Sequence, residues 1–306
     1  MGTVAGMRVH LVDGTYELFR QHFGAGKPRG GASEPGRYAA TIGVLGSTLA
    51  LVEDGATHIG VASDHIIESF RNDLWPGYKT SEGMPPELLH QIPVLEDALV
   101  AMGVTTWAMV EYEADDALGA AAAIADADAR VEQVLIVTPD KDLCQCVRGT
   151  RVVEFDRRKR EIIDEAGVIE KFGVGPASIP DYLGLVGDTA DGYPGLPGWG
   201  AKSAAGVLAR YGHLEDIPPL VADWDVPGVR GTVQLAATLR SQIELALLFR
   251  RIATVELDVE VGSVDDWCWT GPTPQFAAVA ERIGAPELTG RAERAAVRAA
   301  GRSAAG

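Results

Sequence analysis

Acidic side chains follow each of four apolar, β-branched runs in this 306-residue chain. The seven carboxylates at these positions are Asp13, Asp64, Glu113, Asp115, Asp116, Asp140 and Asp142. If the runs are parallel strands, their carboxyl ends meet at one edge of a sheet, where open parallel sheets bind their ligands. Carboxylates gathered there would repel one another strongly unless cations lay among them. Because hard oxygen ligands suit Mg²⁺ or Mn²⁺ and not zinc, the spacing predicts a divalent-metal site.

Each acidic residue taken alone also has a structural explanation. Asp13 could begin a turn, and Asp140 could cap a helix. The acidic residues of the E-x-D-D motif at 113–116 could favour a helix N-terminus through the helix dipole. Recurrence after all four runs favours the metal site, and E-x-D-D sends several carboxylates to one place from a single helical turn.

A glycine-rich segment, GLPGWGAKSA at residues 195–204, is the second group of interest. A glycine-rich turn that enters a helix presents backbone N–H groups at the positive end of the helix dipole, which suits a phosphate. Lys202 adds a cation, and Asp188 and Asp191 before it are two further carboxylates spaced to point together. Such a turn is also typical of a simple helix–helix connection, so both interpretations stay open.

Basic and aromatic residues interleave in the segment SFRNDLWPGYKT, residues 69–80. The basic residues are Arg71 and Lys79, and the aromatic ones are Phe70, Trp75 and Tyr78. Base-stacking and phosphate-binding groups in alternation suit single-stranded nucleic acid. An amphipathic helix that ends at Pro76-Gly77 explains the same residues equally well.

The elements that would position these residues alternate between strand and helix up to about residue 155. The expected strands are Met7–Val12, His58–Ala62, Val104–Val110 and Val134–Thr138, and the expected helices are Arg37–Glu53, Pro86–Met102 and Glu113–Ala127. Apolar strands that alternate with helices predict an α/β fold with a mostly parallel sheet covered on both faces. Beyond a hairpin at 151–163 we expect helices, including Val229–Arg251, Thr273–Ile283 and Pro286–Ala300, and then a disordered tail.

Composition limits the class of protein. Lys plus Arg number 27 and Asp plus Glu 43, a net charge of −16, and 46% of residues are apolar. These values are ordinary for a globular protein and exclude collagen, coiled coil and wholesale disorder. No apolar run approaches the ~20 residues that span a bilayer, and no signal peptide is recognisable, so we expect a soluble cytoplasmic protein. The three cysteines argue against a disulfide framework. The acidic charge does not exclude a polyanionic partner, because bound cations would reverse the local field.

In this order, the motifs resemble the bacterial 5′-nuclease family, which includes the 5′→3′ exonuclease domain of DNA polymerase I, phage 5′-exonucleases and flap endonucleases. The matching motifs are LVDG (11–14), SD (63–64), SFR…YK (69–79), YEADD (112–116), TPDKDL (138–143), GDTAD (187–191) and GLPGWGAKSA (195–204). The resemblance covers about residues 7–260, and no polymerase sequence follows, so a stand-alone nuclease is expected. It implies a PIN-like α/β core over 1–175 with a helical arch at about 67–92. It further implies a helical region over 176–262 with a helix–three-turn–helix motif at about 188–211, and then a helical extension and tail over 263–306.

The resemblance also implies residue roles. The implied metal ligands are Asp13, Asp64, Glu113, Asp115, Asp116, Asp140, Asp142, Asp188 and Asp191. The implied phosphate-contacting catalytic residues are Lys79 and Arg71, and the implied DNA-binding residues are Tyr78, Gly195, Gly198, Gly200, Lys202 and Ser203. Backbone carbonyls of Leu196 and Trp199 are expected to bind K⁺. The chain departs from the family pattern at Glu82 (usually Arg), Gly192 (usually Asn) and Ser63 (usually Phe), and residues 24–36 resemble a mobile glycine-rich loop.

The function implied by the resemblance is a structure-specific 5′ nuclease, a 5′→3′ exonuclease and flap endonuclease. It would hydrolyse DNA by a two-metal mechanism with Mg²⁺ or Mn²⁺ in primer removal, Okazaki fragment maturation and repair. The expected partners are DNA with 5′ flaps, nicks or 5′ ends, and RNA primers in RNA–DNA hybrids, bound by a monomer. One alternative is a PIN-type ribonuclease, against which the long helical segment argues. The other is a non-catalytic DNA-structure-binding accessory protein, against which the full set of nine carboxylates argues.

Overall fold

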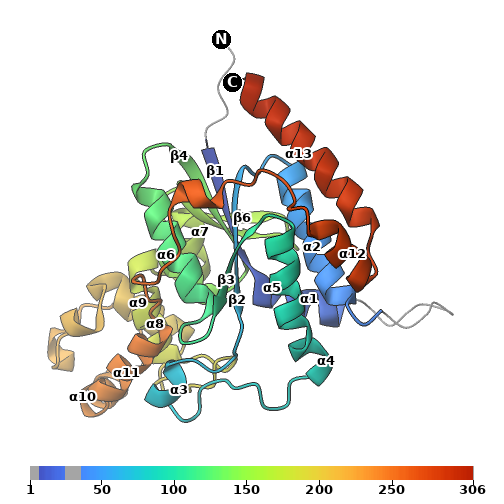
Figure 1. Ribbon diagram of the computed structural model, residues 1–306. Coiled ribbons are helices and arrows are strands. Elements are labelled where there is room, and N and C mark those ends of the chain that lie inside the picture. Colours follow the sequence, from blue (N-terminus) through green and yellow to red (C-terminus); the bar gives the residue numbers. More distant parts are fainter. Residues whose placement is uncertain (1–6, 25–35, 306) are drawn as a thin grey trace. The chain divides into compact units, whose positions relative to one another are not determined.

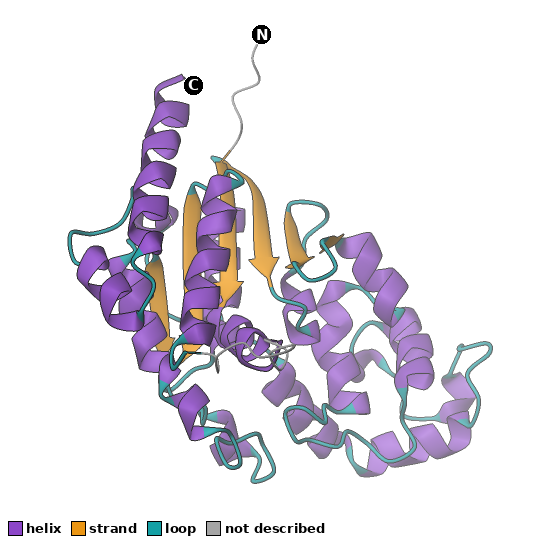
Figure 2. Cartoon of the chain, turned by 90° about the vertical axis from the view of Figure 1, so that its right-hand side faces the viewer, coloured by secondary structure: helices purple, strands orange, loops and turns teal. Residues whose placement is uncertain are grey.

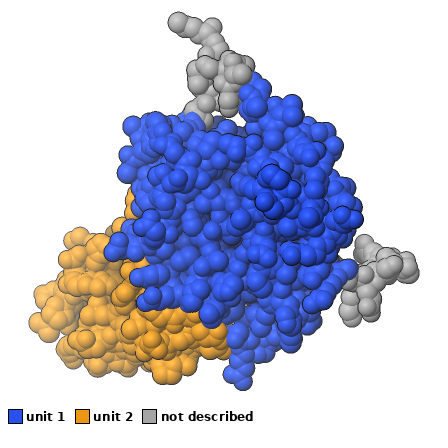
Figure 3. All heavy atoms as spheres, in the orientation of Figure 1, with its two compact units in different colours: residues 1–67, 81–138, 257–306 blue, residues 68–80, 139–256 orange. Residues whose placement is uncertain are grey.

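The computed structural model describes residues 7–24 and 36–305, with side chains up to residue 301. Nearly all of the predicted mobile loop at 24–36 lies outside the described residues. The chain forms two compact units, shown in different colours in Figure 3. The first unit comprises residues 1–67, 81–138 and 257–306, and the second unit comprises residues 68–80 and 139–256. The domain boundaries expected at residues 175 and 262 follow sequence motifs and remain predictions.

Four parallel strands form the centre of the first unit (Figure 2). They are β1 (Met7–Asp13), β2 (His58–Asp64), β3 (Thr105–Met109) and β4 (Val131–Val137), in the order β3-β2-β1-β4. Every residue of β2 is buried, as expected of a strand with helices on both faces. The prediction of a mostly parallel α/β sheet is therefore confirmed.

The helices between these strands cover the sheet on both faces (Figure 1). They are α1 (Gly14–Gly24), α2 (Ala39–Glu53), α5 (Gln91–Ala101) and α6 (Ala114–Ala127), whereas the short α4 (Pro86–Leu89) packs against α5 and α1. The chain advances from β1 to β2 to β3 in one direction and then returns to β4 beyond β1. Because parallel crossovers are right-handed, α6 lies on the face opposite to the other helices. The reversal places a topological switch point at the carboxyl ends of β1 and β4, where such sheets bind ligands.

The C-terminal segment belongs to the fold of the first unit. It contains α12 (Phe276–Ile283) and α13 (Glu287–Ala305). The indole N–H groups of Trp107 and Trp267 both donate to the Val261 carbonyl, at 3.1 and 2.8 Å. Arg291 of α13 pairs with Glu53 of α2 at 2.7 Å. The backbone of α13 stays helical to Ala305, so the expected disordered tail is wrong, because this alanine-rich segment has high helix propensity.

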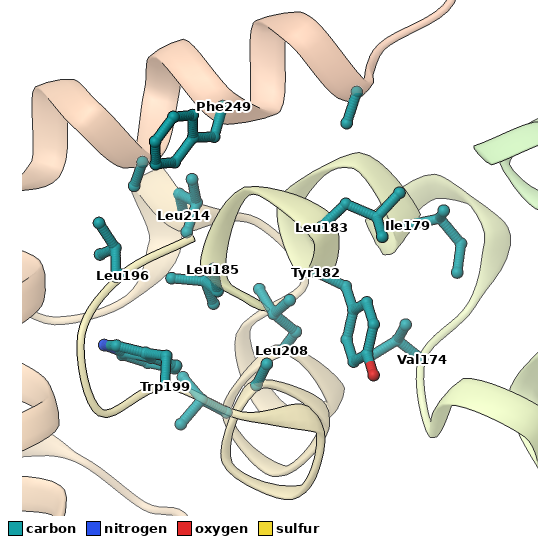
Figure 4. Packing of buried hydrophobic residues seen from close by; sticks show 14 of the residues in the cluster. Val174, Ile179, Tyr182, Leu183, Leu185, Leu196, Trp199, Leu208, Leu214 and Phe249 are labelled. Carbon is teal, nitrogen blue, oxygen red and sulfur yellow. The ribbon is translucent and has the colours of Figure 1, made fainter. Parts of the chain in front are cut away.

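Helices dominate the second unit, which also contains the hairpin of β5 (Val152–Asp156) and β6 (Glu161–Ile163). They are α3 (Arg71–Leu74), α7 (Glu165–Phe172), α8 (Ile179–Val186), α9 (Ala201–Tyr211), α10 (Thr232–Ser241) and α11 (Ile243–Ala253), with the 3₁₀ helix η1 (Lys141–Cys146). Their apolar faces meet in a core that includes Leu183, Leu208 and Phe249 (Figure 4). The single helix expected over Val229–Arg251 begins only at Thr232 and is interrupted at Gln242.

The segment expected to be a helical arch, residues 67–92, is helical at α3 and α4 and where α5 begins. Residues 75–85 form turns and loops. Pro76 and Pro85 restrict the backbone there, and Gly83 has a φ of +81°, which no helix continues. The helix expected over Pro86–Met102 is also divided, at His90. Among the described residues, no helix has the length and apolar character needed to cross a membrane.

Candidate active site

The first group of predicted metal ligands lies in the first unit, at the switch point. Asp13 ends β1 and is buried, and its Oδ1 accepts the Tyr16 backbone N–H at 2.8 Å. Its Oδ2 accepts the hydroxyl of Thr138, the residue after β4, at 3.0 Å. The carboxylate of Asp13 therefore bridges the ends of two neighbouring strands.

Asp64 and the E-x-D-D motif extend this group along the sheet edge. Asp64 ends β2, and its Oδ1 accepts the backbone N–H of Ala114, the first residue of α6, at 2.7 Å. Glu113 is the N-cap residue of α6, and its N–H donates to Asp116 Oδ2 at 2.9 Å. Glu113 and Asp116 are buried and Asp115 is half-buried. These carboxylates thus lie at the ends of neighbouring strands, but several of their oxygens also stabilise the start of α6.

A hydrogen-bonded network beside Asp64 was not found by sequence reasoning. The Ser63 hydroxyl donates to Glu96 Oε1 at 2.7 Å, and His65 Nδ1 lies 2.6 Å from Glu96 Oε2. Ser63 and Glu96 are buried. The network explains why a serine is tolerated where the family usually has phenylalanine, since the hydroxyl has a partner. No signal in the sequence joins residue 96 to residues 63 and 65.

The second group of predicted metal ligands lies in the second unit. Ligand oxygens of Asp142, Asp188 and Asp191 all lie within 4.8 Å of one another. Asp140 caps η1, and its Oδ1 accepts the Asp142 N–H at 3.0 Å. Burial, followed by the negative charges of Asp140 and Asp191, raises the pKa of Asp142 well above its usual range. Asp142 Oδ1 is buried and has no hydrogen-bond partner among the described residues.

Two lysines approach this acidic cluster. Lys79 Nζ pairs with Asp191 Oδ1 at 3.1 Å, and the Lys79 N–H donates to the Asp191 carbonyl at 3.0 Å. Lys141 Nζ pairs with Asp188 Oδ2. Lys79 was predicted, but Lys141 was not, although its position between two aspartates in TPDKDL is a signal for such a pair.

The donor set of the second group fits a hard divalent cation. It offers only carboxylate oxygens, and one of them is buried without a hydrogen-bond partner among the described residues. Buried like charges at this separation are costly unless a cation offsets them. Oxygen ligands of this kind are those that Mg²⁺ and Mn²⁺ prefer.

Two residues that were predicted to contact nucleic acid are buried in this structure. The Arg71 side chain is buried, and its Nε and Nη2 donate to the carbonyls of Ile252 and Thr254 at 2.8 and 3.1 Å. These bonds hold α3 against the end of α11. Tyr78 is 4% exposed and packs in the core of the second unit. Tyr78 thus has a packing role in this structure, and its contact with DNA stays a prediction.

The glycines of the predicted phosphate seat have different roles. Gly195 has a φ of +69°, and a Cβ there would lie 2.4 Å from the Gly187 nitrogen, so close packing requires glycine. Gly198 has a φ of +83°. Gly200 has a φ of −147°, and a Cβ there would have nothing within 4 Å. Neither the backbone conformation nor packing within the described part of the protein therefore requires glycine at position 200.

Lys202 and Ser203 lie at the start of α9. Lys202 is exposed, whereas the Ser203 hydroxyl is used locally, because it donates to the Gly200 carbonyl at 2.9 Å and accepts the Gly200 N–H at 3.0 Å. Both residues line a cavity of about 680 Å³ together with Gly198 and Gly200. Leu196 and Trp199, whose carbonyls were expected to bind K⁺, are buried, and the Leu196 carbonyl accepts the Trp199 N–H at 3.1 Å.

Close packing explains why this chain has glycine at position 192, where the family usually has asparagine. Gly192 has a φ of +83°, and a Cβ there would lie 2.0 Å from the Gly77 carbonyl oxygen. The Trp75 indole N–H also donates to the Gly192 carbonyl at 3.1 Å. The close approach of residues 75–77 excludes the larger residue that the family usually has.

Two family models of one exonuclease family match adjoining parts of this chain. Residues 8–173 match the family model described as 5′-3′ exonuclease, N-terminal resolvase-like domain, and residues 174–275 match 5′-3′ exonuclease, C-terminal SAM fold. DNA polymerase I of Mycobacterium leprae is 32% identical over 264 residues, which are 84% of this chain and 28% of that protein. The 5′-3′ exonuclease of Aquifex aeolicus is 30% identical over 260 residues, which are 84% of this chain and 85% of that protein.

A solved structure shows the same fold. The flap endonuclease of bacteriophage T5, in a pseudo-enzyme-product complex with DNA and metal ions, has a TM-score of 0.61 and 19% sequence identity. The match covers 95% of this chain and 99% of that one. By contrast, the chain spans less than a third of the length of DNA polymerase I from Mycobacterium leprae.

Proposed function

Because this chain belongs to the 5′-3′ exonuclease family, we propose that it hydrolyses DNA phosphodiesters as a structure-specific 5′ nuclease on 5′ flaps, nicks and 5′ ends. The observation that carries the proposal is the cluster of Asp142, Asp188 and Asp191, whose ligand oxygens lie within 4.8 Å of one another. The Aquifex relative supports it, because the match covers most of both chains. Primer removal, Okazaki fragment maturation and repair are the processes that such an activity serves.

The predicted metal ligands of the second unit and those of the first unit are both proposed to hold Mg²⁺ or Mn²⁺. In the second unit these are Asp140 and the cluster of Asp142, Asp188 and Asp191. In the first unit they are Asp13, Asp64, Glu113, Asp115 and Asp116. When bound, two such cations lower the pKa of the attacking water and stabilise the leaving 3′ oxygen.

The basic residues have separate roles in this proposal. Lys79 Nζ, which pairs with Asp191 in this structure, contacts the scissile phosphate and offsets the charge that develops there. Arg71 acts indirectly, because its buried guanidinium holds α3, and hence the segment that carries Lys79, against α11. Lys141 orients Asp188 through their ion pair.

The glycine turn is proposed to hold the duplex. Gly198 and Gly200 leave the backbone at the start of α9 open to a phosphate, and Lys202 adds a positive charge. A backbone phosphate contact carries no base code, so binding depends on DNA structure and not on sequence. K⁺ would bind at the carbonyls of Leu196 and Trp199, and it would fix the shape of this turn.

A metal-dependent cleavage assay tests the proposal. The wild-type protein with Mn²⁺ is expected to cleave a 5′-flap duplex, and Asp142→Asn and Asp188→Asn are expected to abolish cleavage and to lower the number of Mn²⁺ ions bound in calorimetry. Asp216→Asn, at an exposed aspartate of the same unit, is the matched control and should leave both unchanged.

The substrate panel separates the alternatives. Cleavage of single-stranded RNA without flap cleavage would favour a ribonuclease, and flap binding without cleavage would favour an accessory protein. RNA–DNA hybrid substrates, sedimentation and cell fractionation test the RNA-primer activity, the monomeric state and the cytoplasmic location, which belong to the same proposal.

A further inference from the structure

Two turns in the second unit have the same construction. The first turn is Leu196-Pro197-Gly198-Trp199, and the second turn is Val226-Pro227-Gly228-Val229. In each, the N–H of the fourth residue donates to the carbonyl of the first, at 3.1 and 3.2 Å. Gly198 and Gly228 have φ values of +83° and +87°. Proline second and a positive-φ glycine third are the features of a type II turn.

Both turns lead into helices of similar length. The first turn precedes α9, whose N-cap residue is Gly200, and the second turn precedes α10, whose N-cap residue is Gly231. Neither glycine has a side chain that could accept the first N–H groups of its helix. The spacing differs, because Gly200 directly follows the first turn, whereas Arg230 stands between the second turn and Gly231. What the two segments share is a helix start whose first backbone N–H groups have no side chain at the N-cap to accept them.

The two turns line the same cavity. Its volume is about 680 Å³, and its lining includes Gly198, Gly200 and Lys202 from one segment and Gly228 and Arg230 from the other. Val229 fixes the second turn against α9, because its Cγ2 lies 2.5 Å from where a Cβ on Gly206 would be. The position of Arg230 relative to α9 is thus set by packing.

The charges in this cavity are not neutralised by the described part of the protein. Lys202 and Arg230 are both exposed, and neither forms an ion pair or hydrogen bond with any residue in the described part of the chain. Other arginines of the same unit, such as Arg210 and Arg250, are paired with acidic residues. Two such cations in one cavity of a protein with a net charge of −16 indicate a negatively charged ligand.

We propose that the second turn, with Arg230, is a second phosphate-binding site, so that Lys202 and Arg230 hold the DNA duplex backbone at two phosphates. This inference rests on the proposed nuclease function and extends its DNA contacts to residues 226–231. The planar guanidinium of Arg230 can donate two parallel hydrogen bonds to one phosphate, whereas Lys202 acts as a point charge. Gly200, where glycine serves neither conformation nor packing within the described residues, leaves room for the backbone to approach.

The salt dependence of binding tests the proposal. Affinity for a 5′-flap duplex is measured by fluorescence anisotropy in EDTA at several KCl concentrations from about 50 to 200 mM, where each phosphate contact contributes roughly one unit of log–log slope. Arg230→Gln is expected to lower the magnitude of the slope by about one unit and to weaken binding about equally for different DNA sequences. Lys202→Gln should do the same, and the double variant should lose about two units.

Two matched variants complete the design. Arg230→Lys keeps the charge and should keep the slope, although it loses the paired hydrogen bonds and some affinity. Arg240→Gln removes an exposed arginine that is outside the cavity and unpaired among the described residues, and it should leave slope and affinity unchanged.

The outcomes distinguish this inference from the function on which it rests. If the wild-type protein cleaves flaps with Mn²⁺ but Arg230→Gln keeps the wild-type slope and affinity, the second site is refuted and the nuclease function stands. A slope that falls equally in Arg240→Gln also refutes it, because the effect would then be general charge. If the wild-type protein neither binds nor cleaves flap DNA, both proposals fail.

Discussion

Replacement of Glu154 by glutamine is expected to change how the stability of this protein depends on pH. Glu154 lies on β5 and is fully buried. Burial raises the pKa of Glu154 to about 8, although the neighbouring Cys144 thiol and the charge of Lys171 lower it in part. Glutamine has nearly the same shape and no ionisable group, so it removes the titration and keeps the packing.

The magnitude follows from proton linkage. The pKa rises from 4.5 in a solvated glutamate to about 8 in the folded protein, so folding takes up a proton between these values. Stability from this group is therefore highest below about pH 4.5 and falls as the pH rises toward about 8. At about 1.4 kcal/mol for each pKa unit, the wild-type protein should lose about 4 kcal/mol relative to Glu154→Gln between about pH 5 and pH 8.5.

Urea unfolding of both proteins across this pH range measures the difference. The amide that Glu154→Gln introduces is also buried, but its cost does not change with pH, so only the difference in slope matters. Glu170→Gln, at an exposed glutamate of α7, is the control and should follow the wild-type curve. Parallel pH profiles for Glu154→Gln and the wild-type protein would refute the reasoning, because they would show that Glu154 titrates alike in the folded and unfolded chains.

Gly192→Ala is expected to lower the free energy of unfolding by about 1–3 kcal/mol, because φ is +83° and the new Cβ would lie 2.0 Å from the Gly77 carbonyl oxygen; a thermal midpoint equal to that of the wild-type protein would contradict this. Arg71→Ala should cost about 2–3 kcal/mol in urea unfolding, since it leaves two backbone carbonyls near the end of α11 without their donors, and an unchanged midpoint would show that these bonds contribute nothing. Lys79→Ala should slow single-turnover flap cleavage by about 10²–10³ with little change in duplex affinity, and an unchanged rate would exclude contact with the scissile phosphate.

Local patterns in the sequence were enough for the parallel sheet and for the acidic residues at its edge. The apolar runs that end in Asp13 and Asp64 form β1 and β2, because β-branched residues buried on both faces favour a central strand wherever the rest of the chain goes. Glu113 begins α6 as its N-cap, which the E-x-D-D spacing also indicates. Their recurrence after four apolar runs predicted a divalent-metal site, and resemblance to a known family then implied the individual ligands.

Helix boundaries followed the sequence less closely. Two predicted helices are each divided into two, at His90 and at Gln242, although apolar residues continue on both sides of each interruption. The apolar spacing there fits one helix or two, so the packing of each half decides between them. The boundaries of helices in the expected arch were uncertain for the same reason. Prolines and glycines indicate that the helix is interrupted there, but they do not determine how many residues the non-helical segment contains.

The roles of individual polar and aromatic residues needed the tertiary structure. Phe70 and Tyr78 are equally plausible stacking residues in the sequence, yet only contacts with distant helices show that Tyr78 is in the core. Gly192 must be glycine because residue 77 approaches it, although the two lie far apart in the sequence. Whether Arg230 lies beside Lys202 likewise depends on how Val229 packs against α9. Strand and helix periodicity is local and can be recognised in a short window, whereas burial and charge pairing depend on which distant segments the fold brings into contact.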